Sequence, residues 1–131
     1  MVRRNGTKTD MRIASMILPS KDNNGVDLTD VHCALRTVLC DTFGGFTAIE
    51  SQGGWNSDAG LLYLESGVTY MLSMDDSEES RAKLESIALF YGHMAAQLCV
   101  MVVHANGAVK FVDCAVTQPV SHAAIAAFAS V

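Results

Sequence analysis

Hydrophobic positions recur with two different periods along this chain, and the two periods alternate. Short apolar, β-branched or aromatic runs are typical of strands, and they occur at Arg12–Leu18, Phe46–Glu50, Leu61–Met74, Cys99–His104 and Val109–Val112. Two longer segments, at about 28–42 and 78–97, repeat apolar residues every three or four positions, as one face of a helix does. Asn106-Gly107 is a strong hairpin signal between the last two strands. The predicted order is strand, helix, strand, strand, helix, strand, followed by a hairpin.

Short polar residues and glycine mark the ends of both predicted helices. Asp27 is the predicted N-cap of the first helix, and Gly44 follows its last turn, where a left-handed residue is favoured. Asp76 with Glu79 resembles a capping box at the start of the second helix.

Glycines also punctuate the predicted strands. We expect Gly53-Gly54 to break the second strand before a turn at 56–60. Gly67 lies inside the third, where it predicts either a bulge or a short hairpin extension that runs into a core strand.

This order of elements predicts an α+β fold, a ferredoxin-like split βαβ sandwich. Both helices would cover one face of an antiparallel sheet, with an extra C-terminal hairpin. Residues 11–131 are expected to form a single domain, behind a flexible N-terminal arm of residues 1–10. Hydrophobic residues make up 50% of the chain and charged residues 18%. That apolar share predicts a homo-oligomer that buries the open face of the sheet.

Charge and composition argue against several classes of partner. The formal net charge is −5 and most basic residues are scattered, so nucleic-acid binding is not expected. No apolar run is long enough for a membrane span, and no signal peptide is recognisable, so we expect a cytoplasmic protein. Its four cysteines are interpreted as reduced, mostly buried thiols. No metal-ligand spacing and no cofactor motif is present, so neither a metal nor a cofactor is predicted.

Three residues in the glycine-rich middle of the chain are candidates for ligand binding. Trp55 follows two glycines, where it can stack on a flat ligand, face a cation, or simply anchor the loop. Glu50 and Glu65 each end an apolar run. A carboxylate there either binds an ammonium group from a partly buried position or faces solvent.

Other candidates favour a structural interpretation. Tyr63 and Tyr70 lie in the long third strand, where packing in the core or at an interface is expected. His104 ends an apolar strand and is expected at an exposed edge.

The run from Met16 to Asp113 resembles the small phage-encoded S-adenosylmethionine (SAM) lyases, long called SAM hydrolases. It is similar also to a wider group of short, uncharacterised phage and bacterial proteins. The wider group shares Phe43-Gly44-Gly45-Phe46-Thr47, then Gly-x-Trp, then a strand glutamate. The lyases resemble the chain in a first helix that ends in a Gly-aromatic segment, followed by a glycine with an aromatic residue close behind it and then a glutamate at the third strand, places that Gly54-Trp55 and Glu65 occupy here. The lyases have tyrosine where this chain has Trp55.

The resemblance implies a trimer of ferredoxin-like subunits with sites between them. It also implies a reaction in which the carboxylate of SAM attacks its own γ-carbon and expels methylthioadenosine, leaving homoserine lactone. In that scheme Glu65 is the catalytic residue and holds the α-ammonium group. The other substrate-binding residues would be Trp55, Phe46, Tyr63 and Glu50, with the aromatic rings stacking on adenine or facing the sulfonium.

The alternative is a non-catalytic protein of the same fold. It would be an oligomeric domain of phage or mobile-element origin that binds a small ligand or another protein. The sequence has no P-loop, no dinucleotide fingerprint and no nucleophile elbow, and this absence favours the alternative.

Overall fold

A computed structural model describes residues 10–114 of the chain. Its elements are β1 Met11–Pro19, α1 Thr29–Phe43, β2 Thr47–Asn56, β3 Leu62–Asp75, α2 Glu78–Met94, β4 Cys99–Val103 and β5 Val109–Asp113. Residues 1–9 of the predicted arm, and the C-terminal segment from 115, where helical turns are predicted, lie outside the described residues. Within the described part, no helix is both long and apolar enough to cross a membrane.

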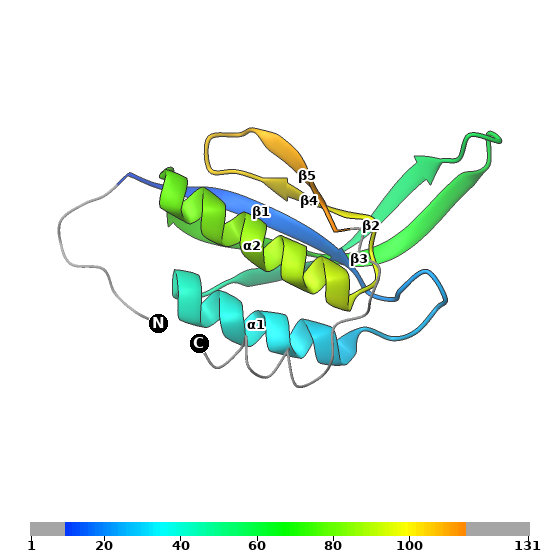
Figure 1. The fold of residues 1–131 in the computed structure, drawn as a ribbon, viewed down its shortest axis with the longest axis horizontal. Coiled ribbons are helices and arrows are strands. Elements are labelled where there is room, and N and C mark those ends of the chain that lie inside the picture. Colours follow the sequence, from blue (N-terminus) through cyan, green and yellow to red (C-terminus); the bar gives the residue numbers. More distant parts are fainter. Residues whose placement is uncertain (1–9, 115–131) are drawn as a thin grey trace.

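The five strands form one antiparallel sheet in the order β2-β3-β1-β4-β5. Both helices lie side by side on one face of it (Figure 1). The first four strands have the ferredoxin-like order, and the β4–β5 hairpin adds one more strand at the edge. This confirms the predicted α+β fold, including the extra hairpin, whose turn contains Gly107 at φ +88°.

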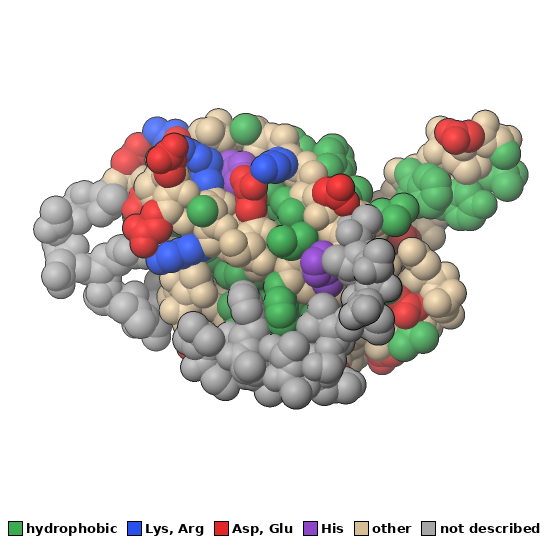
Figure 2. All heavy atoms as spheres, in the orientation of Figure 1, with side chains coloured by type: hydrophobic (Ala, Val, Ile, Leu, Met, Phe, Trp, Pro, Cys, Tyr) green, Lys and Arg blue, Asp and Glu red, His purple; other side chains and the backbone are tan. Residues whose placement is uncertain are grey.

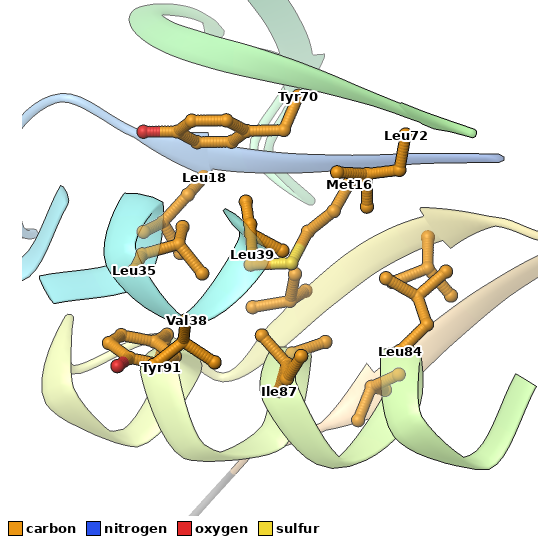
Figure 3. Packing of buried hydrophobic residues seen from close by; sticks show 14 of the residues in the cluster. Met16, Leu18, Leu35, Val38, Leu39, Tyr70, Leu72, Leu84, Ile87 and Tyr91 are labelled. Atoms are coloured by element: carbon orange, nitrogen blue, oxygen red, sulfur yellow. The ribbon is translucent and has the colours of Figure 1, made fainter. Parts of the chain in front are cut away.

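The core lies between the sheet and the two helices. Alternate residues of β1 and β3 face the helices, because side chains alternate between the two faces of a strand. Met16 and Leu18 of β1 and Leu72 of β3 are almost completely buried there. They pack among apolar side chains of α1 and α2 (Figure 3), which include Leu35, Val38, Leu39, Leu84, Ile87 and Tyr91.

The opposite face of the sheet stays open in the single chain. It carries exposed apolar side chains from four strands, namely Ile13, Ile49, Met71 and Phe111. Such a face is what the apolar composition led us to expect, and its burial by a second copy remains a prediction.

The two longest strands run beyond the body of the molecule as a projecting hairpin (Figure 1). We call residues 52–65 the hairpin arm. Pairing between β2 and β3 continues from Thr47↔Met71 to Asn56↔Leu62, so the prediction that Gly53-Gly54 breaks β2 was wrong. These exposed glycines are simply paired within an isolated two-stranded ribbon.

Gly67 marks the hairpin extension rather than a bulge, because the β2–β3 register is unbroken across it. It also pairs with Pro19 of β1. A Cβ atom at Gly67 would lie 3.1 Å from the carbonyl oxygen of Leu18. This glycine therefore allows β1 to approach β3 closely where the arm leaves the body.

The helix ends are partly as predicted. Gly44 ends α1 with φ +87° as expected. The N-cap of α1 is Leu28 instead of Asp27, although Asp27 accepts hydrogen bonds from the amide and hydroxyl of Thr29. At α2 the cap is Ser77, because Asp76 pairs with Arg81 instead.

Candidate functional site

Three of the predicted site residues gather on one face of the hairpin arm. Trp55 and Tyr63 are directly opposite each other in the β2–β3 ladder, with ring centroids 4.6 Å apart and planes at 18°. Glu65 is two residues from Tyr63, so its side chain emerges on the same face. The two rings are 52% and 44% exposed, and Glu65 is exposed as well. A flat or cationic ligand therefore has access to an aromatic surface beside a carboxylate.

The other two predicted residues lie on the opposite face. Phe46 packs edge-on against the ring of Tyr70, with centroids 5.7 Å apart. Glu50 pairs with Val68, whose side chain is buried on the helix-covered face, and Glu50 itself is exposed. Within one chain the five predicted residues therefore form two groups on opposite strand faces. Trp55, Tyr63 and Glu65 lie on one face, and Phe46 and Glu50 lie on the other.

A buried polar cluster beside Phe46 was not predicted. His32 of α1 is 7% exposed, and its Nδ1 lies 2.5 Å from the hydroxyl of Tyr70. Its Nε2 lies 2.8 Å from the carbonyl oxygen of Pro19. Because a carbonyl only accepts, Nε2 carries the proton, and Nδ1 of a neutral ring accepts from Tyr70. The same hydroxyl accepts a hydrogen bond of 3.2 Å from Nε of Arg36.

The charge state of this cluster follows from its surroundings. Burial lowers the pKa of His32, with the charge of Arg36 as a smaller cause in the same direction. Burial also raises the pKa of Tyr70. The guanidinium of Arg36 lies 5.7 Å from the ring centroids of both Phe46 and Tyr70. At neutral pH the cluster therefore holds one positive charge, fixed by a hydrogen bond and two aromatic rings.

A cavity of about 160 Å³ adjoins the cluster at the start of α1. Its lining comes from the loop after β1, the first two turns of α1 and one residue of β3: Ser20, Asp27, Thr29, His32, Cys33, Arg36 and Val68. His32 and Arg36 are four apart on a helix, a spacing that puts them on one face. The sequence shows this spacing, which could have indicated that His32 and Arg36 act together. It does not show their shared partner, Tyr70 on β3, which lies 34 residues after Arg36.

A second polar group links α2 to the β4–β5 hairpin. His104 is 5% exposed, and its Nε2 lies 2.8 Å from a carboxylate oxygen of Glu85. The other oxygen of Glu85 accepts a hydrogen bond from Lys110 at 2.6 Å. The prediction of an exposed edge histidine was therefore wrong. His104 can be buried because its ring is hydrogen-bonded to the carboxylate of Glu85, which lies on α2, 19 residues earlier in the chain.

The cysteines also differ from expectation. Among the described residues all four are free thiols, but only Cys114 is buried. Cys33, Cys40 and Cys99 are exposed.

Known structures share the fold of this chain. A phage SAM lyase in complex with S-methyl-5'-thioadenosine superposes with a TM-score of 0.63, covering 86% of this chain and 95% of its own, at 15% identity. A phage SAM lyase in the apo state gives a TM-score of 0.61, covering 90% and 99%, also at 15% identity. No curated protein matches the sequence. At this identity the likeness shows a shared fold.

The family comparison is based on sequence alone. Residues 19–111, from the end of β1 to within β5, match the profile of a family described as a protein of unknown function (DUF3574). The match spans both helices, the hairpin arm and the buried polar cluster. The chain belongs to this DUF3574 family.

Proposed function

We propose that this protein is a SAM lyase that cleaves SAM to methylthioadenosine and homoserine lactone. The observation that carries the proposal is the stacked Trp55–Tyr63 pair with Glu65 beside it. These residues lie in a fold shared with a phage SAM lyase bound to S-methyl-5'-thioadenosine.

The proposed reaction is an intramolecular displacement. A carboxylate oxygen of SAM forms a bond to the γ-carbon of the same molecule, and the bond from that carbon to sulfur breaks. The electron pair of the broken bond stays on sulfur, which turns the sulfonium into the neutral thioether of methylthioadenosine. No proton has to be removed, so the protein needs no strong base. Its contribution is to hold the substrate folded, with the carboxylate close to the γ-carbon.

The arm residues have the properties that such positioning requires. An aromatic face attracts a sulfonium through its quadrupole and stacks on adenine. Glu65 would hold the α-ammonium group through a charge-assisted hydrogen bond, which leaves the carboxylate of SAM free to attack. The stacked rings are neighbours of Glu65 on one strand face, so all three can contact one ligand.

A second copy of the chain would complete this site. On a single chain the arm projects from the body and both rings are about half exposed, so a bound ligand would remain in water on one side. The arm also carries exposed leucines, and Figure 2 shows hydrophobic side chains gathered on it. We propose a homo-oligomer, with a trimer favoured by the resemblance. There the arm of one copy packs on the next, and Phe46 and Glu50 from one copy can join Trp55 and Glu65 from another.

The direct test is to incubate the purified protein with SAM and separate the products by chromatography. Methylthioadenosine is expected from the wild-type protein, and its absence at micromolar enzyme would overturn the proposal. Glu65→Gln should slow turnover by more than about tenfold, since a hydrogen bond to a charged group contributes about 1.5–3 kcal/mol. Glu78→Gln, an exposed glutamate of α2, is the matched control and should keep the wild-type rate.

The alternative is a non-catalytic binding domain, and the apolar surface of the arm favours it. Leu61, Leu62 and Leu64 are 58–65% exposed, and an apolar patch of this kind commonly marks a binding surface for another protein. This function predicts no turnover of SAM. Loss of partner binding on Leu64→Ser, with the fold intact, would support it.

A further inference from the structure

Two opposite charges that do not pair with each other line the cavity at the start of α1. Asp27 and Arg36 both line it, and neither forms an ion pair with any residue that the structure describes. Charged side chains that face one cavity without neutralising each other leave it complementary to a ligand with both signs of charge.

Arg36 provides the positive side of the cavity; its side chain is exposed and has donors to spare. Nε of Arg36 is bonded to Tyr70, and the guanidinium lies near two aromatic rings. Within residues 10–114, no group accepts a hydrogen bond from its two terminal nitrogens. These nitrogens form the end of the guanidinium fork, which binds a carboxylate through two parallel hydrogen bonds.

Asp27 provides the negative side, and its exposed carboxylate is hydrogen-bonded to Thr29. Oδ1 of Asp27 accepts from the amide of Thr29 at 3.0 Å and from its hydroxyl at 2.7 Å. Those bonds hold the carboxylate in place, and no described residue donates to Oδ2. An ammonium group is a suitable donor to this second oxygen.

We infer that this cavity binds an α-amino acid, with its carboxylate on Arg36 and its ammonium group on Asp27. Ser20 adds a hydroxyl to the lining, and Val68 adds an apolar surface for a side chain. At about 160 Å³ the cavity has room for a small amino acid, which is the ligand we expect.

This site is separate from the arm residues of the one proposed for SAM, although the guanidinium of Arg36 lies 5.7 Å from the ring centroid of Phe46, which belongs to that proposed site. Trp55 and Glu65 lie on the arm, on the strand face opposite to that of Val68. The cavity lies on the Val68 side of the sheet, next to α1. The inference therefore does not require that the protein cleaves SAM, and binding can be measured without turnover.

Isothermal titration of the wild-type protein with the standard L-amino acids tests the inference. At least one small amino acid should give saturable binding. Its analogue that lacks the amino group, and its carboxamide, should each bind at least about tenfold more weakly. If no amino acid binds at millimolar concentration, or if the acid without the amino group binds equally well, the inference is overturned.

Two variants locate the site. Arg36→Met keeps an apolar stem near the rings, and Asp27→Asn keeps an oxygen for Thr29; each should weaken amino-acid binding at least about tenfold. Their melting temperatures show whether the fold is intact. Lys83→Met and Asp58→Asn remove exposed charges elsewhere and should bind as the wild-type protein does. Unchanged binding in both folded cavity variants would place the ligand elsewhere and refute the assignment.

Discussion

Helix α2 packs closely against β4 at Gly92, and a single methyl group there tests the packing of the core. A Cβ atom at this position would lie 2.8 Å from Cγ2 of Val100 and 3.1 Å from Cβ of Cys114, and it would clash with the sulfur of Cys114. Both neighbours are buried, and the amide of Cys114 is bonded to the carbonyl of Leu98. Relief of the contacts therefore requires new side-chain rotamers or a backbone shift within a buried core.

Two opposing effects determine the magnitude for Gly92→Ala. Alanine favours a helix over glycine by about 1 kcal/mol. Overpacking of a dense core costs about 1–3 kcal/mol, and two close contacts with fixed neighbours put this site at the upper end. The expected net loss in the free energy of unfolding is about 2 kcal/mol. For a domain of this size that corresponds to a melting temperature lower by about 8 °C.

Thermal and urea unfolding followed by circular dichroism measure this loss. Gly45→Ala is the matched control, because a Cβ atom there would meet nothing within 4 Å and its φ is not positive. Its free energy of unfolding should change by no more than about 0.5 kcal/mol. If Gly92→Ala were as stable as the wild-type protein, the close approach of α2 to β4 would be wrong.

Three further predictions concern the buried polar groups and the arm. Tyr70→Phe should lower the free energy of unfolding by about 1–3 kcal/mol, because it leaves Nδ1 of buried His32 without a donor; an unchanged urea midpoint would contradict this. The pKa of Glu85 is lowered, first by its hydrogen bond to Lys110, so its ionised form stabilises the fold above its ordinary pKa of 4.5. The stability gap between wild type and Glu85→Gln should therefore shrink as the pH falls below that value, and a gap independent of pH would refute the assignment. Trp55→Ser should shift the mass measured by light scattering towards the monomer, and a monomeric wild-type protein would rule out the proposed oligomer.

The fold could be predicted because its main signals are local. Helical spacing marked α1 and α2, and Asn106-Gly107 marked the β4–β5 turn. The length of the hairpin arm could not be predicted from local sequence signals. Gly53-Gly54 is a strong local breaker, yet the ladder with β3 continues through it. Pairing across strands decides such a case, and it depends on residues about ten positions away.

Only part of the candidate site could be predicted from the sequence, for a related reason. Trp55, Tyr63 and Glu65 lie close together in one hairpin, so a pattern in one short stretch could identify them. The cavity combines a loop after β1, a helix face and a residue of β3. His32 and Arg36 gain their meaning only from Tyr70, which local sequence presents as an ordinary core residue.

The intramolecular cleavage of SAM is the central claim, and the products formed in water labelled with heavy oxygen test it most directly. Mass spectrometry should detect methylthioadenosine together with homoserine lactone that carries no label, because both lactone oxygens come from the substrate. Later hydrolysis of the lactone would place label only in the carboxylate. Methylthioadenosine accompanied by homoserine labelled at its γ-hydroxyl would show direct attack by water, and an absence of methylthioadenosine would show that the protein is not a SAM lyase.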